Sequence, residues 1–180
     1  RQRQMCIRDS SKSGAKLRKN VVLTGMMGVG KSTVGKRLAI HLDHDFIDID
    51  NLIEKKEGCS ITMIFKNKGE SYFRTLEKKI TLRELKKDNA VISLGGGAFL
   101  EKTIRRAVKD TSLSIWLDVS TNTLVKRLKR TNKRPLLLKK NLNETVKKIY
   151  LERKKFYNES DFRIKCDFIK TDVIVDKILE

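Results

Sequence analysis

The chain has 180 residues, 39% of them hydrophobic, which suits one globular domain that buries a core without disulfides or metals. Its 41 lysines and arginines outnumber 22 acidic residues, and the net charge of +19 favours anionic partners such as nucleotides, acidic metabolites, nucleic acids or membrane surfaces. The three cysteines are widely spaced, which argues against a disulfide framework or a zinc site and predicts a cytoplasmic location. No apolar run approaches the roughly 18 residues of a membrane span, which argues against membrane insertion.

The pattern of apolar runs predicts the secondary structure in chain order. Residues 1–19 are polar, basic and aperiodic, and we expect a disordered or non-native arm there, followed by a single domain over 20–180. Short apolar runs predict strands at 21–24, 45–49, 90–94, 114–119 and 162–165. Helical spacing predicts helices at 31–42, 51–57, 60–67, 70–87, 101–109, around Leu124 and Leu128 up to Arg130, 142–157 and 173–179. This alternation predicts an α/β fold in which helices cover both faces of a five-stranded parallel sheet, as a three-layer sandwich.

The stretch GMMGVGKST, residues 25–33, lies between the first predicted strand and the first predicted helix. It fits the P-loop pattern Gly-x-x-x-x-Gly-Lys-Ser, in which backbone amides and the positive end of the following helix bind phosphates. In that pattern Lys31 reaches the β and γ phosphates and Ser32 binds Mg²⁺. The alternative is a glycine-rich turn that merely connects a strand to a helix. The P-loop interpretation predicts a phosphate binder but does not name the acceptor.

Two acids, Asp48 and Asp50, stand at the end of the second predicted strand. Strand side chains alternate, so both would lie on one side of the strand and face the phosphates at the carboxyl edge of the sheet. One would hold Mg²⁺ through water and the other would take or orient a substrate hydroxyl. The alternative is that Asp50 caps the next helix. A third acid, Asp118, is interpreted as a residue that marks the start of the helix after Ser120 and needs no catalytic role.

Three glycines, Gly95, Gly96 and Gly97, directly follow the strand at 90–94. Their lack of side chains would let a ligand approach the backbone closely, although a tight turn is the alternative. Arg74, in SYFRTLE on a predicted helix, is by itself no more than a solvated cation.

Several motifs occur together in one order: GMMGVGKST, FIDID, SYFRTLE, VISLGGGAFL, WLDVS, KRPLL and ERKKFY. With this series, the chain from about Asn20 onward resembles the shikimate kinases, small P-loop enzymes that phosphorylate the 3-hydroxyl of shikimate with ATP in aromatic amino acid biosynthesis. The resemblance implies a P-loop NTPase fold of the nucleoside monophosphate kinase type.

The resemblance also implies roles for individual residues. The ATP phosphates would be bound by Gly28, Val29, Gly30, Lys31, Ser32 and Thr33. Mg²⁺ would be held by Ser32 and Asp48. The acceptor would be bound by Asp50, which also activates its hydroxyl, by the carboxylate clamp Arg74 and Arg153, and by the backbone of Gly95, Gly96 and Gly97. Glu77 would steady Arg74.

A lid near 127–141 is implied as well. Arg134 matches the lid arginine that closes over the γ phosphate, and it completes the implied catalytic set with Lys31 and Asp50. Arg130 is the candidate for the adenine contact, with Arg127 as its alternative.

Two other functions compete with this interpretation. Another P-loop small-molecule kinase, such as a gluconate kinase, would share the phosphate loop but lack the combination of Arg74, the three glycines and Arg153. A P-loop module that binds RNA or DNA would cluster cations and aromatics on one surface, whereas cations here occur along nearly every predicted helix. We therefore expect ATP and shikimate as ligands, no nucleic acid partner, and a monomer.

Overall fold

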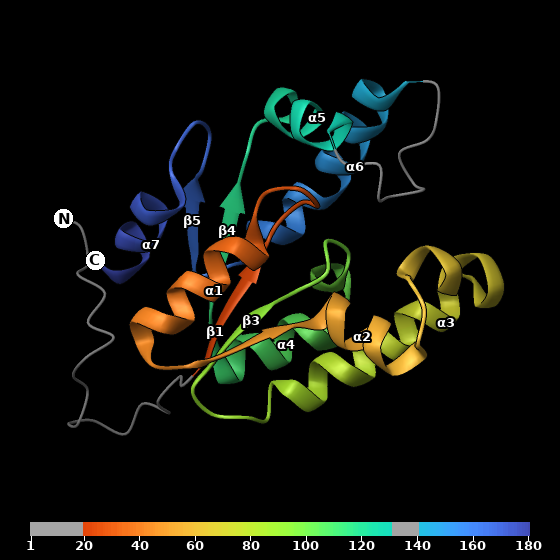
Figure 1. Cartoon of the computed structure of the whole chain (residues 1–180), viewed down its shortest axis with the longest axis horizontal. Helices are drawn as coiled ribbons and strands as arrows, with labels where there is room; N and C mark the ends of the chain where they lie inside the picture. The colour runs from red at the N-terminus through yellow and green to blue at the C-terminus, as the bar shows by residue number, and fades with distance from the viewer. Residues whose placement is uncertain (1–19, 131–140) are drawn as a thin grey trace.

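The computed structural model describes residues 20–130 and 141–180, and one parallel sheet organises them (Figure 1). The strand order is β2-β3-β1-β4-β5. The strands are β1 (Asn20–Thr24), β2 (Asp45–Asp48), β3 (Ala90–Ser93), β4 (Ser112–Asp118) and β5 (Phe162–Lys165). Every residue of β1 and β3 is buried, as expected where helices cover both faces of a sheet. The predicted five-stranded parallel sheet is confirmed.

Seven helices connect and cover the strands in the described part of the chain. They are α1 (Lys31–Leu42), α2 (Ile49–Glu57), α3 (Ile61–Glu84), α4 (Lys102–Thr111), α5 (Thr121–Lys129), α6 (Leu142–Tyr157) and α7 (Thr171–Leu179). A single 3₁₀ turn, η1 (Ala98–Leu100), follows the three glycines and was not predicted. Helices α1 and α7 pack side by side, and α4 packs against β4 and α3 (Figure 1). None of the helices described has the length and apolar character that crossing a membrane requires.

Helix α3 joins two helices that the sequence predicts separately. Gly69 interrupts it with a φ of 80° and a ψ of 170°, so the helix is kinked there. A positive φ is readily adopted by glycine because it has no Cβ. The segment after the kink carries Arg74 and Glu77, and it faces the carboxyl end of β3.

The boundary between β2 and α2 differs from the prediction. The strand ends at Asp48, and Ile49 already begins the helix. The Asp48 side chain accepts a hydrogen bond from the backbone N–H of Asn51, which makes Asp48 the N-cap. Asp48 and Asp50 therefore do not share one face of a strand, and Asp48 rather than Asp50 is the capping residue.

Candidate active site

The phosphate loop connects β1 to α1 in a conformation that its glycines permit. Gly25, Gly28 and Gly30 have φ values of 134°, 80° and 102°. A Cβ on Gly25 would lie 2.5 Å from the carbonyl oxygen of Leu117 in β4, so this glycine also allows the loop to pass close to the sheet. Helix α1 begins directly after Gly30 and has no acidic residue in its first turn, which leaves its positive end available to an anion.

The ammonium group of Lys31 lies against the same loop. Its Nζ donates hydrogen bonds to the carbonyl oxygens of Gly25 and Met26, both at 3.0 Å, and the residue is only 9% exposed. Of the other predicted phosphate ligands, Val29 is buried within the loop and Thr33 is exposed on α1. The cation is thus held at the mouth of the loop, where it can exchange carbonyl partners for phosphate oxygens.

The two predicted metal ligands are in direct contact. Ser32 Oγ donates a hydrogen bond to Asp48 Oδ2, although 16 positions separate the residues. Hydroxyl and carboxylate oxygens are ligands that Mg²⁺ prefers, and Mg²⁺ in nucleotide sites commonly takes one or two protein ligands together with waters and phosphates. This donor set beside a phosphate loop therefore fits Mg²⁺.

Asp50 points away from that pair. Asp50 lies in the first turn of α2, whereas Asp48 precedes the helix with an extended backbone (φ −106°, ψ 113°), so their side chains do not share one face. A Cβ on Gly95 would lie 2.7 Å from Asp50 Oδ1 and closer still to Glu77 Oε1. The two acids thus face different places, Asp48 toward the phosphate loop and Asp50 toward the three glycines. The expectation that both acids face the phosphates is therefore wrong for Asp50, and the separate roles assigned to the two acids stay predictions.

Charged side chains crowd the segment Gly95–Gly97. Asp50 and Glu77 approach Gly95 as described. Arg153 Nη1 donates to the carbonyl oxygen of Gly96 at 2.9 Å. A Cβ on Gly97 would lie 2.5 Å from Arg74 Nη1 and 2.7 Å from Nη2. A Cβ at Gly95 or Gly97 would displace the ends of these charged side chains, and one at Gly96 would be tightly packed, so the glycines leave room for this charged cluster.

This charged cluster adjoins the phosphate loop. A Cβ on Gly96 would lie 3.3 Å from the backbone N of Met27 and 3.7 Å from the carbonyl oxygen of Gly25. The same Gly25 carbonyl accepts a hydrogen bond from Lys31. The predicted phosphate-binding groups and the two guanidinium groups therefore meet at one rim of the sheet, at the carboxyl ends of β1 and β3.

The guanidinium group of Arg74 is positioned by two carboxylates of its own helix. Nη1 donates to Glu77 Oε2 at 2.7 Å, while Nε and Nη2 both donate to Glu70 Oε1 at 3.3 Å. Glu77 is only 2% exposed, and its Oε1 has no hydrogen-bond partner. Burial raises the pKa of Glu77, Arg74 opposes that change, and the nearby charge of Asp50 raises the pKa further.

Two tyrosines that the sequence reasoning missed attach α6 to the sheet. Tyr157 is fully buried, and its hydroxyl donates to the carbonyl oxygen of Gly96, beside Arg153. Burial raises the pKa of Tyr157 to about 12, so the hydroxyl stays a donor. One turn before Arg153, Tyr150 donates to Asp118 Oδ1 at 2.9 Å. The spacing Tyr150, Arg153, Tyr157 places all three on one helix face, and this is the signal that could have identified them.

The structure gives Asp118 a different role from the predicted one at the start of a helix. Its Oδ2 accepts hydrogen bonds from Arg163 Nε at 3.0 Å and Nη2 at 2.6 Å. The cap of α5 is Ser120, whose side chain accepts from the backbone N–H of Thr123. Through Arg163 and Tyr150, Asp118 therefore connects β5 and α6 to the end of β4.

The predicted nucleotide contacts near the end of α5 lie partly outside the described residues. Arg127 Nη1 donates to the carbonyl oxygen of Val29 at 3.0 Å, which brings this arginine to the phosphate loop. Arg130 is exposed and ends the helix. Arg134 and most of the predicted lid lie outside the described residues. Of the two adenine candidates, Arg127 contacts the phosphate loop, whereas Arg130 follows at the exposed end of the helix.

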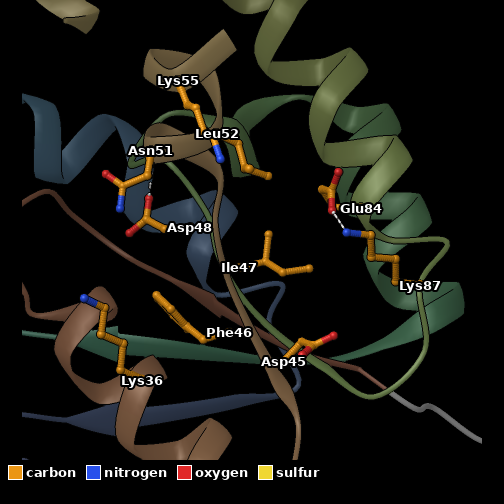
Figure 2. Close-up of a pocket in the computed structure, with 10 residues that line it drawn as sticks. All are labelled: Lys36, Asp45, Phe46, Ile47, Asp48, Asn51, Leu52, Lys55, Glu84 and Lys87. Carbon is orange, nitrogen blue, oxygen red and sulfur yellow. Dashed lines mark hydrogen bonds and ion pairs between the residues drawn. The ribbon is translucent and has the colours of Figure 1, made fainter.

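Figure 2 shows a separate pocket along the outer edge of β2, between α1, α2 and α3. Its described lining is Lys36, Asp45, Phe46, Ile47, Asp48, Asn51, Leu52, Lys55, Glu84 and Lys87. Asp48 is the single predicted site residue in this set. The pocket therefore lies beside the cluster of glycines and arginines and does not contain it.

A parallel sheet with this strand order, a P-loop after β1 and a cluster of charged side chains around the glycines after β3 is typical of a P-loop kinase. The family model described as shikimate kinase matches residues 27–180. A shikimate kinase from Persephonella marina is 46% identical over 161 residues, which cover 89% of this chain and 97% of that relative. The chain belongs to the shikimate kinase family.

Solved structures agree with this assignment. The shikimate kinase from Acinetobacter baumannii in complex with shikimate superimposes with a TM-score of 0.86 at 31% identity, covering 89% of this chain and 90% of that one. A gluconokinase from Sinorhizobium meliloti superimposes with a TM-score of 0.53 at 16% identity, which shows a shared fold alone. The gluconate kinase alternative therefore has only distant structural support.

Proposed function

We propose that the protein transfers the γ-phosphoryl group of ATP to the 3-hydroxyl of shikimate, giving shikimate 3-phosphate and ADP. The observation that carries this proposal is the meeting of two guanidinium groups, from Arg74 and Arg153, with Asp50 around three glycines directly beside the phosphate loop. A small acceptor that carries both a carboxylate and hydroxyl groups matches these partners. The family supports the same acceptor.

The acceptor would be gripped by its two chemically different sides. Arg74 and Arg153 would bind the carboxylate, because a planar guanidinium group presents two parallel N–H donors to it. Asp50 would accept hydrogen bonds from ring hydroxyls on the side nearer the phosphate loop. The backbone of the glycine segment would form the floor, since its lack of side chains leaves room for the ring.

The chemistry would depend mainly on position and charge. Lys31 and the amides of the phosphate loop would orient the β and γ phosphates, and Ser32 and Asp48 would hold Mg²⁺, which neutralises charge on those phosphates when bound. Asp50 would take the proton from the acceptor hydroxyl while the oxygen of that hydroxyl attacks the γ phosphorus in line with the leaving oxygen of ADP. Arg134, outside the described residues, is proposed to add positive charge at the γ phosphate.

Other proposals concern the setting of the enzyme. We propose a monomer in the cytoplasm that binds no nucleic acid and has a single domain over 20–180 with a lid near 127–141. Dispersed cations support the absence of a nucleic acid partner, widely spaced cysteines support the cytoplasm, and the length supports one domain. The lid rests on the family.

The function is tested by an ADP-release assay that offers the purified protein one acceptor at a time. With MgATP present, shikimate is expected to give saturable turnover, whereas gluconate and a nucleoside are expected to give no more ADP than the acceptor-free background. Product analysis should locate the phosphate on the 3-hydroxyl. Equal turnover with gluconate would contradict the proposal.

Arg74→Lys is expected to weaken acceptor binding selectively. The lysine retains a positive charge beside Glu77 but loses the planar fork, so the KM for shikimate should rise about tenfold or more. The KM for ATP is expected to stay close to that of the wild type, because Arg74 lies at the glycine segment rather than in the phosphate loop. Steady-state kinetics with each substrate varied in turn measures both values.

A matched control is Arg83→Lys, the same change on the same helix. Arg83 is largely exposed and pairs with Glu84, which lines the edge pocket of Figure 2. This variant should leave both KM values unchanged. If Arg83→Lys impaired acceptor binding and Arg74→Lys did not, the acceptor site would have to move to the edge pocket.

A further inference from the structure

The carboxyl group of Glu77 lies in an asymmetric environment. Its Oε2 accepts the short hydrogen bond from Arg74, whereas its buried Oε1 has no hydrogen-bond partner. That free oxygen points toward Gly95, on the side where Asp50 Oδ1 also converges. A carboxylate that is almost removed from water thus has one ionic contact and faces a second carboxylate.

The charged groups around Glu77 come from three helices. Arg74 on α3 is in direct contact, Arg153 on α6 adds a weaker favourable charge, and Asp50 on α2 adds an unfavourable one. Glu70 accepts hydrogen bonds from Nε and Nη2 of the same Arg74 guanidinium group, but its side chain is exposed. The ionised form of Glu77 therefore depends chiefly on Arg74.

Under the proposed function, Arg74 must also serve the carboxylate of the acceptor. An acceptor carboxylate at this guanidinium group would compete with Glu77 for N–H donors and would place a further negative charge close by. A buried charge that loses its partner is costly, and a buried carboxyl group escapes that cost by binding a proton. Protonation would also turn the free oxygen of Glu77 into a hydrogen-bond donor. Two ionised carboxylates, as at Glu77 and Asp50, can only accept hydrogen bonds and cannot donate one to each other.

We propose that Glu77 takes up a proton when shikimate binds. Arg74 can then bind the acceptor carboxylate without leaving the buried Glu77 carboxylate charged and unpaired. This inference rests on the proposed function, because it requires Arg74 to bind that carboxylate. It makes Glu77 a positioning residue whose protonation state is coupled to acceptor binding.

The direction of the coupling follows from linkage. Burial already raises the pKa of Glu77 in the free protein, and the loss of Arg74 together with a new anion would raise it further. At a pH between the free and bound pKa values, binding takes up between zero and one proton. In that window the dissociation constant for shikimate rises with pH, by up to about tenfold per pH unit when a whole proton is bound. Below the window Glu77 is already protonated and no uptake occurs.

The test is calorimetric titration of the nucleotide-free protein with shikimate. Titrations are run at each pH in two buffers that differ in ionisation enthalpy, at several values from about pH 5 to about pH 9. The difference in heat between the buffers gives the number of protons taken up. The wild-type protein is expected to take up a measurable fraction of a proton within that range, with an affinity that falls as pH rises.

Glu77→Gln should abolish that uptake and flatten the pH dependence of the affinity, because glutamine binds no proton. Glu70→Gln is the matched control: it removes the other carboxylate from the same guanidinium group, and the uptake should persist. The wild-type titration decides the question even if Glu77→Gln does not fold. No uptake in the wild type at any pH, or uptake unchanged in Glu77→Gln, overturns the inference. Absence of any shikimate binding would instead contradict the proposed function.

Discussion

Lys31→Met is expected to lower the turnover number roughly 10³-fold, because it removes a preorganised positive charge from the phosphates while keeping an apolar stem of similar length. The ammonium group now lies against the Gly25 and Met26 carbonyl oxygens at the mouth of the loop, so its loss acts where the γ phosphate would be. Steady-state kinetics at saturating shikimate and ATP measures the effect.

The control for this change is Lys36→Met on the same helix. Lys36 is exposed and lines the edge pocket of Figure 2 rather than the phosphate loop. Its turnover number should match that of the wild type, and both variants should unfold in single thermal transitions. Retained turnover in Lys31→Met would show that this lysine is not the group that binds the transferred phosphate.

Asp50→Asn is expected to lower turnover about 10²–10⁴-fold, the usual range for removing a positioned general base. The amide keeps the size of the side chain and its place at Gly95, so the KM for ATP should change little. The measurement is kcat with each substrate varied, combined with direct binding of ATP.

Asp45→Asn provides the corresponding control, since Asp45 is an exposed acid at the start of β2. It should be kinetically silent. An Asp50→Asn enzyme with an unaffected rate would rule out the role of Asp50 as the base and leave it as a binding group only.

Local patterns were sufficient to predict most of the fold. The bounds of α1, α6 and β5 coincide with the predictions, because each depends on the apolar spacing of its own segment. The phosphate loop is equally local: its glycines, lysine and hydroxyl groups are contiguous in the chain.

The boundary at Asp48 could not be placed from apolar spacing. Ile47 and Ile49 continue the alternation of a strand, so the pattern runs through the point where the helix starts. The hydrogen bond from Asn51 to the Asp48 side chain decides the boundary, and only the folded backbone reveals which acid makes it.

Contacts between distant segments were the other missing part. The approach of Asp50 to Glu77 depends on how α2 and α3 meet at Gly95, and the hydrogen bond of Tyr157 to Gly96 depends on the docking of α6. Neither follows from the spacing of residues within one segment. The approach of Asp50 to Glu77 is one of the features from which the protonation of Glu77 is inferred.

The glycine segment after β3 also bears on how such an enzyme can change over evolution or by design. Hydrogen is the smallest side chain there is, and Gly95 and Gly97 already have carboxylate or guanidinium groups at the distance where a methyl group would clash. Substitutions at this floor can only narrow the space. We therefore expect a variant that accepts a bulkier or differently charged ring to arise through the surrounding helices, at positions such as Arg74 and Arg153.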